Sequence, residues 1–181
     1  MIRLFVGLSL PERDRRALSR LQCGLKNARW VAADNLHVTL RFIGTVDESQ
    51  AEDYATALDD VLAQPFDLRV KGVGTFGRPP HNLWAGVADQ PAGVLAHLQA
   101  RVESVLVRAG LPPEGQKFSP HVTLARLKKS THPGPVADFL TAHEALQQPS
   151  FKVSGFTLFE SQLSTIRFHG AHYTAFAEYD L

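Results

Sequence analysis

The sequence contains only one cysteine, which limits both its redox chemistry and its metal chemistry. Cys23 has no partner for an intramolecular disulfide, and the chain has no CxxC pair that could hold a metal ion. A chain without disulfides is typical of a reducing compartment, so we expect a cytoplasmic protein.

The chain also lacks a strong net charge and a long apolar run. Its 19 Lys and Arg residues stand against 18 Asp and Glu residues, giving a net charge of +1. The molecule as a whole therefore has no bulk attraction to nucleic acid, which leaves only a local basic patch for such a role. The apolar start, residues 1–10, is too short for a signal peptide, and no run approaches the length of a membrane span.

The length and composition that remain are those of an ordinary globular protein. The 181 residues include 44% hydrophobic and 20% charged side chains, which predicts one domain over residues 1–181. Ser9 and Glu12 have the spacing of a capping box, with Pro11 between them, and predict the start of the first helix.

The predicted elements follow the same order twice along the chain. The first round comprises a strand at 1–10, a helix at 9–28, a strand at 35–44, a helix at 47–65 and strands at 66–76 and 82–88. The second comprises a helix at 90–113, a strand at 119–127, a helix at 133–149 and strands at 150–161 and 172–181. This repetition predicts two similar lobes.

The tetrapeptide HVTL occurs in both rounds, at residues 37–40 and 121–124. Side chains alternate between the two faces of a strand, so each histidine points the same way as the threonine two residues later. Val and Leu then point the other way and can pack against helices. If a twofold relates the lobes, the polar faces line one cleft with two imidazoles and two hydroxyls.

Such a cleft suits acid–base chemistry on a phosphodiester. An imidazole has an unperturbed pKa of about 6.5, so one ring can accept a proton from water while the other donates to a departing oxygen. Threonine hydroxyls can donate to phosphoryl oxygens. Acyl transfer would need a nucleophile beside a base, and the sequence has no GxSxG motif.

Two other interpretations of the histidines remain at this point. Each ring alone could be a structural group that is hydrogen-bonded in the core. A metal site is the second alternative, but the sequence has no HExxH motif and no carboxylate pair at ligand spacing near His37 or His121. The matching position of the two rings favours a shared role, and because two histidines alone make a poor metal site, we expect no metal and no other cofactor.

The segments NLHVTLRFIG and FSPHVTLARL resemble the paired His-x-Thr motifs of the two-histidine (2H) phosphoesterase superfamily. The chain most resembles the bacterial and archaeal RNA 2′,3′-cyclic phosphodiesterases, also called 2′-5′ RNA ligases. The start RLFVGLSLP, the central NLWAGV and the closing segment at 157–181 resemble that family too, so the resemblance covers nearly the whole chain.

This resemblance implies a bilobal α+β fold. Two lobes of antiparallel sheet, related by a pseudo-twofold, would carry helices on their outer faces and the two HxT motifs in a central cleft. It also implies a metal-independent reaction in which water opens a terminal 2′,3′-cyclic phosphate and leaves a 2′-phosphomonoester. Joining RNA ends through a 2′-5′ linkage is the reverse reaction.

The resemblance also implies a role for each site residue. His37 would be the general acid on the departing 3′ oxygen, and His121 would be the general base on the water. Thr39 and Thr123 would hold phosphate oxygens. Two further residues follow the histidines by five positions: Arg126 would contact the phosphate, and Phe42 would offer an aromatic face to the terminal base.

The positions of Arg126 and Phe42 conflict with simple alternation. Each lies an odd number of residues after its histidine, so a regular strand would point it to the opposite face. Either the strand ends, bends or bulges after the motif, or the side chain reaches around the edge of the sheet.

The expected substrates are RNA ends or oligonucleotides with a 2′,3′-cyclic phosphate, handled by a monomer that does not contact a membrane. One alternative from another class stays open: a non-catalytic module that binds a nucleotide or RNA on the same scaffold. Another is a different 2H reaction, such as opening the cyclic phosphate to a 3′-monoester.

Overall fold

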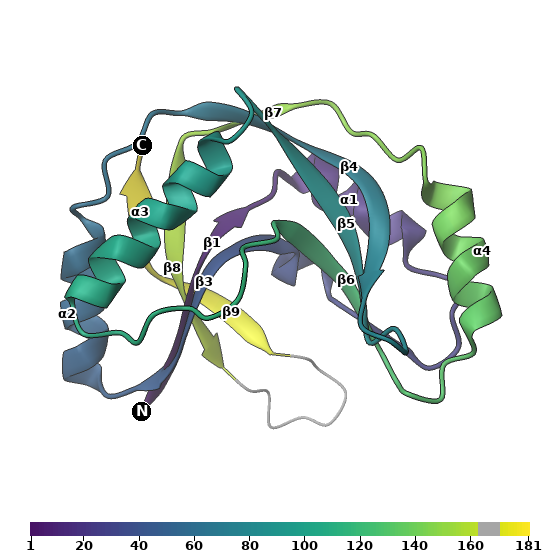
Figure 1. The fold of residues 1–181 in the computed structure, drawn as a ribbon, viewed down its shortest axis with the longest axis horizontal. Helices are drawn as coiled ribbons and strands as arrows, with labels where there is room; N and C mark the ends of the chain where they lie inside the picture. Colours follow the sequence, from purple (N-terminus) through teal and green to yellow (C-terminus); the bar gives the residue numbers. More distant parts are fainter. Residues whose placement is uncertain (163–170) are drawn as a thin grey trace.

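Nine strands form a curled sheet with four α-helices on its outer side (Figure 1). This computed structural model describes residues 1–162 and 171–181. The strands are β1 Ile2–Ser9, β2 Ala28–Trp30, β3 His37–Val46, β4 Phe66–Phe76, β5 Asn82–Gln90, β6 His121–Leu127, β7 Phe151–Val153, β8 Gly155–Gln162 and β9 His172–Asp180. The α-helices are α1 Glu12–Leu21, α2 Glu48–Leu58, α3 Val94–Arg108 and α4 Pro133–His143. In the described ranges, no helix combines the length and the apolar character that crossing a membrane requires.

The sheet consists of two halves that meet at a narrow joint. The strand order is β7-β4-β5-β6-β3-β1-β8-β9, with β2 added beside β6, and all ladders between these strands are antiparallel. The two halves are joined where β3 meets β6, and the residue pair of that ladder is Val38 with Val122. The predicted α+β class with an antiparallel sheet is therefore confirmed.

Helices α1 and α3 each follow a strand of one half of the sheet but lie on the other half. Helices α2 and α3 pack on each other and on β1 and β3, whereas α4 packs on β4. Helix α1 precedes β3 in the chain but lies beside β4–β6 in Figure 1. The side chain of Gln22, just after α1, donates to the carbonyl oxygen of Leu124 in β6. Each half of the sheet is therefore stabilised by segments from both halves of the sequence.

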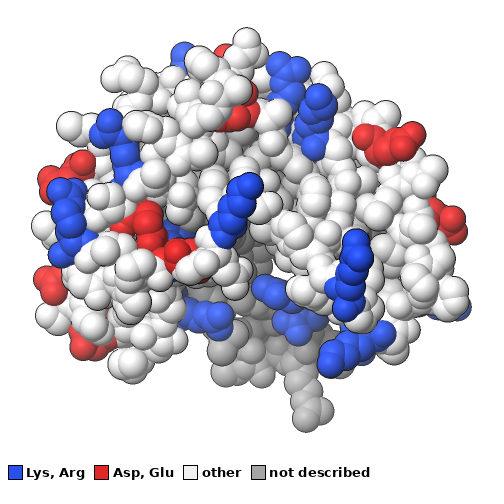
Figure 2. Space-filling view, in the orientation of Figure 1, with Lys and Arg blue, Asp and Glu red and all other residues white. Residues whose placement is uncertain are grey.

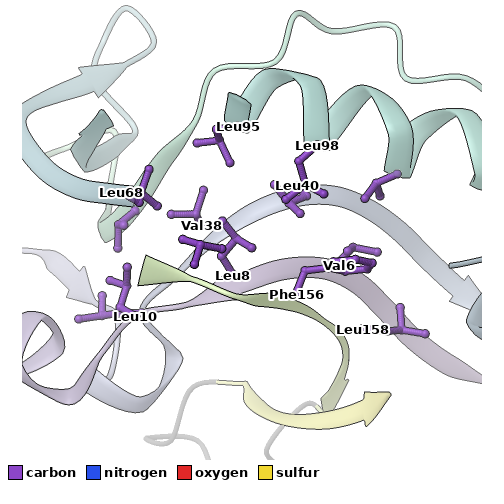
Figure 3. Packing of buried hydrophobic residues seen from close by; sticks show 14 of the residues in the cluster. Val6, Leu8, Leu10, Val38, Leu40, Leu68, Leu95, Leu98, Phe156 and Leu158 are labelled. Carbon is purple, nitrogen blue, oxygen red and sulfur yellow. The ribbon is translucent and has the colours of Figure 1, made fainter. Parts of the chain in front are cut away.

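The apolar positions of the HVTL motifs form the centre of the core. Val38, Leu40, Val122 and Leu124 are all buried, as their alternation predicts. Figure 3 shows Leu98 of α3 above Leu40 of β3, with β1 next to β3 in the sheet. Burial of these side chains away from water fixes which face of each strand remains open.

The predicted start of the first helix is wrong. Helix α1 begins at Glu12 after Pro11, and no side chain caps it. Ser9 cannot reach the helix, because it is the last residue of β1 and pairs with His37. A capping box does occur at α2, where the side chain of Asp47 accepts from the backbone N–H of Gln50 at 2.8 Å.

We expect Leu98→Ala to lower the free energy of unfolding by about 2–5 kcal/mol, because it leaves a cavity between α3 and the HVTL strand. Urea unfolding followed by circular dichroism measures this change. Leu62→Ala is the matched control: Leu62 is 74% exposed, so its loss should change stability by less than about 0.5 kcal/mol. Equal effects of the two substitutions would contradict this description of the core.

Candidate active site

The two HVTL histidines lie on the same open face of the sheet, on either side of the joint. His37, Thr39, His121 and Thr123 are half-buried, in contrast to the fully buried residues between them. In an antiparallel ladder, the pair Val38–Val122 brings position 37 next to 123 and position 39 next to 121. The geometry therefore brings both predicted motifs together in the arrangement that alternation requires.

Both imidazoles are held in the same tautomer by the same local contact. Nδ1 of His37 donates to the carbonyl oxygen of Asn35 at 2.7 Å, and Nδ1 of His121 donates to that of Ser119 at 2.7 Å. A carbonyl oxygen only accepts, so the proton of each neutral ring lies on Nδ1. Nε2 of each ring is then the atom that can exchange a proton with a ligand.

The environment of His37 favours its neutral form. Burial lowers the pKa of the His37 imidazole below its ordinary value of 6.5, and the positive charge of His121 lowers it further. The bond to Asn35 acts in the opposite direction but is outweighed by burial. Nε2 of His37 lies 3.0 Å from the hydroxyl oxygen of Thr39, which donates to the neutral ring.

A β-bulge in each half of the sheet explains how Phe42 and Arg126 can face the same side as the histidines, although each lies an odd number of residues after its histidine. Between β1 and β3, Gly7 pairs with Thr39 and Val6 with Arg41, so Leu40 is an extra residue. The ladder of β5 with β6 skips Leu124 in the same way. After each bulge the alternation reverses.

This reversal brings the residue five positions after each histidine onto the open face. Phe42 is 56% exposed and Arg126 is exposed as well, whereas the residues just before them, Arg41 and Ala125, are buried. Of the two explanations that the sequence allowed, the bulge is confirmed, and neither side chain needs to reach around an edge.

Aromatic rings that were not predicted from the sequence lie against both histidines. The ring centroid of His37 lies 4.7 Å from that of Phe5 and 5.3 Å from that of Tyr173. His121 lies 4.9 Å from Phe76 in an edge-to-face arrangement. These apolar walls orient the imidazoles and exclude water from one side of each. The signal available in the sequence was that these aromatic residues lie on predicted strands, at 1–10, 66–76 and 172–181.

A buried arginine, also missed, connects the first motif to the segment that leads into the second. Arg41 is 8% exposed, and its Nε donates to Glu103 of α3 at 2.5 Å. Its Nη2 donates to the carbonyl oxygen of Pro112 at 2.5 Å. The second carboxylate oxygen of Glu103 accepts from the backbone N–H of Glu114. This network fixes residues 112–114, which precede His121, against β3.

A small pocket adjoins His37 on the side of β8 and β9. Its volume is about 120 Å³. It is lined by Ser9, Leu10, Arg15, Asp34, Asn35, Leu36, His37, Phe159 and Tyr173. The aromatic and polar lining leaves room beside the imidazole for part of a ligand.

The donor set of this face fits an anion better than a cation. The described residues contain no group of three His, Cys, Asp or Glu side chains that could share a metal ion. Two hydroxyls, the guanidinium of Arg126 and, once a ring is protonated, its Nε2 instead lie on one face and can donate to phosphate oxygens.

Comparison with known sequences agrees with this geometry. The family model of the 2′-5′ RNA ligase superfamily matches residues 10–165. An RNA 2′,3′-cyclic phosphodiesterase of Aeropyrum pernix is 36% identical over 136 residues, covering 74% of this chain and 77% of the relative. A protein of the same name from Thermus thermophilus is 34% identical, covering 99% of this chain and 90% of the relative.

Solved structures show the same fold. Escherichia coli LigT complexed with 3′-AMP has a TM-score of 0.78 and 26% sequence identity, covering 99% of this chain and 98% of that chain. The protein TT0787 of Thermus thermophilus has a TM-score of 0.77 and 26% identity, covering 99% and 97% of the two chains.

We expect the pKa of His37 to lie below 6.5 in the intact protein and to rise toward that value in His121→Gln, because the substitution removes a nearby positive charge. Nitrogen-detected NMR titration of the His37 ring measures both values. His97→Gln, on the outer helix α3, is the control and should leave the pKa of His37 unchanged. An identical His37 pKa in the protein and in His121→Gln would show that the two rings do not share a cleft.

Proposed function

This chain belongs to the 2′-5′ RNA ligase superfamily and is a cyclic phosphodiesterase of RNA ends, and we propose that it works without a metal ion, by proton transfers at His37 and His121. The observation that carries the mechanism is the pair of motifs flanking one residue pair, with Nδ1 of each ring bonded to a backbone carbonyl oxygen and Nε2 left as the atom that exchanges protons. In the reaction, water opens a terminal 2′,3′-cyclic phosphate and leaves a 2′-phosphomonoester.

The proposed steps conserve protons across the reaction. Nε2 of His121 accepts a proton from water as the water oxygen attacks phosphorus. The bond between phosphorus and the 3′ oxygen breaks, and protonated Nε2 of His37 donates its proton to that oxygen. The rings end in exchanged protonation states, and solvent restores them.

The low proton affinity of His37 suits the role of acid. Burial weakens the hold of this ring on its proton in the free protein. An anionic phosphate in the cleft favours the protonated ring, and a weakly held proton is transferred more readily to a departing alkoxide.

The other residues of the face bind the substrate in this proposal. The hydroxyls of Thr39 and Thr123 and the guanidinium of Arg126 donate to the non-bridging oxygens of the phosphate, where negative charge accumulates. The exposed ring of Phe42 offers a surface on which the terminal base can stack.

The remaining expectations are part of the same proposal. By microscopic reversibility the enzyme joins RNA ends through a 2′-5′ linkage, a direction that water disfavours. We propose that residues 1–181 act as one bilobal domain, because a single apolar cluster runs under both halves of the sheet. We further propose a cytoplasmic monomer.

We expect the protein to hydrolyse a nucleoside 2′,3′-cyclic phosphate in the presence of EDTA. His37→Ala and His121→Ala should each lower kcat by about 10²–10⁴-fold, since each removes one proton transfer. Liquid chromatography measures turnover, and phosphorus NMR identifies the 2′-phosphate product. His97→Ala is the matched control, because this ring lies on the outer helix α3.

Three other results of this assay would contradict the proposed reaction. Tight binding without product would favour the non-catalytic module. A 3′-phosphate product would indicate another 2H reaction, and loss of turnover in EDTA would contradict metal independence.

A substrate with sulfur in place of the 3′ oxygen distinguishes the histidine that acts as the general acid from the one that acts as the general base. A thiol has a pKa of about 8.5, so a departing thiolate needs no proton. We expect His37→Ala to be at least about tenfold less impaired on this substrate than on the oxygen compound, whereas His121→Ala should be impaired equally on both. Steady-state kcat/KM values measure this, and the reverse pattern would exchange the two roles.

A further inference from the structure

A second arginine lies directly beside Arg126, at a place the sequence did not single out. In the ladder between β2 and β6, Arg29 pairs with Arg126. On the other side of β6, Asn82 of β5 pairs with Arg126. Three neighbouring strands therefore carry a row of cationic and amide side chains, which we call the Arg29 row (Arg29, Arg126 and Asn82).

The Arg29 row lies on the same face as the histidines. Residues paired in an antiparallel ladder point to the same side of the sheet. The next pair, Trp30 with Ala125, points to the other side, where Ala125 is buried and the Trp30 ring lies 6.1 Å from that of Phe139 in α4. Arg29, like Arg126, is exposed and therefore faces the open side.

Two like charges directly opposite each other destabilise a ladder unless an anion lies between them. No ion pair in the described part of the chain involves Arg29 or Arg126. Figure 2 shows Lys and Arg side chains gathered at the lower right of the molecule, where Figure 1 places the ends of β5 and β6. This local charge contrasts with the overall net charge of +1.

We propose that Arg29, beside Arg126, forms a second phosphate subsite that binds the phosphodiester on the 5′ side of the terminal nucleoside, while Arg126 remains on the cyclic phosphate. The proposal rests on the proposed function, because it assigns to that reaction an RNA of two or more nucleotides in preference to a mononucleotide. Guanidinium groups match phosphate oxygens in a bidentate arrangement.

The position of the row along β6 supports this assignment. Thr123 lies beside His37 across the joint, and Arg126 follows it along the strand, at the end of the cleft where His37 lies. The ribose of the terminal nucleotide carries the 3′ oxygen that His37 protonates, so it occupies that end. Arg29 is one strand beyond Arg126, where the chain continues from the 5′ oxygen of this ribose.

The test compares two substrates in one assay: a nucleoside 2′,3′-cyclic phosphate and a dinucleotide that ends in the same group. The unsubstituted protein should prefer the dinucleotide, and Arg29→Gln should reduce this preference in kcat/KM by about tenfold. The salt dependence of log kcat/KM for the dinucleotide should become shallower by about 0.7, the value for one contact to single-stranded RNA. Arg108→Gln at the exposed end of α3 is the matched control and should retain both.

Failure of the proposed Arg29 subsite and failure of the proposed function give different results in these experiments. If both substrates turn over and Arg29→Gln keeps the full preference and salt slope, the subsite is wrong and the proposed function stands. If the unsubstituted protein turns over neither substrate, the proposed function fails. In that case, fluorescence anisotropy with a labelled RNA ending in a 2′-phosphate still tests the subsite: equal affinities of Arg29→Gln and Arg108→Gln would overturn it.

Discussion

The contact between β3 and β6 is the constraint on which the site depends. Two strands with the same tetrapeptide meet in antiparallel orientation at Val38 and Val122. Because the valines are buried under the helices, the histidines and threonines on either side have only the open face available. A register shift of one residue at this joint would bury the imidazoles and expose the valines. The core that stabilises the fold therefore also positions the chemistry.

The regular features of this arrangement could be predicted from the sequence, and the irregular ones could not. Alternation within HVTL predicts which residues are buried, since a strand has a fixed period of two. The bulges at Leu40 and Leu124 interrupt that period, and no residue type in either motif marks them. Tertiary contacts were equally invisible: Arg41 becomes buried only because Glu103 and Pro112 approach it from other parts of the chain. The capping box expected at Ser9 failed because pairing with His37 keeps that residue in β1.

The two halves of the sheet share the same backbone pattern of motif and bulge but carry different side chains at matching positions. After the matching bulges, Arg41 and Phe42 occupy the positions that Ala125 and Arg126 occupy in the other half. One half thus carries a buried cation and an exposed ring, and the other carries a small core residue and an exposed cation. The aromatic surroundings differ as well, with Phe5 and Tyr173 against His37 and Phe76 against His121. A reaction that needs one acid and one base requires this kind of asymmetry within a symmetric scaffold.

We propose that both imidazoles act on one phosphorus atom from opposite sides. A crystal structure with a nucleoside 2′,3′-cyclic vanadate tests it most directly, because five-coordinate vanadium mimics the transition state. We expect Nε2 of His37 and Nε2 of His121 within hydrogen-bonding distance, roughly 2.6–3.2 Å, of two opposite apical oxygens. A complex in which only one ring contacts the vanadate, or in which both rings contact the same oxygen, would contradict it.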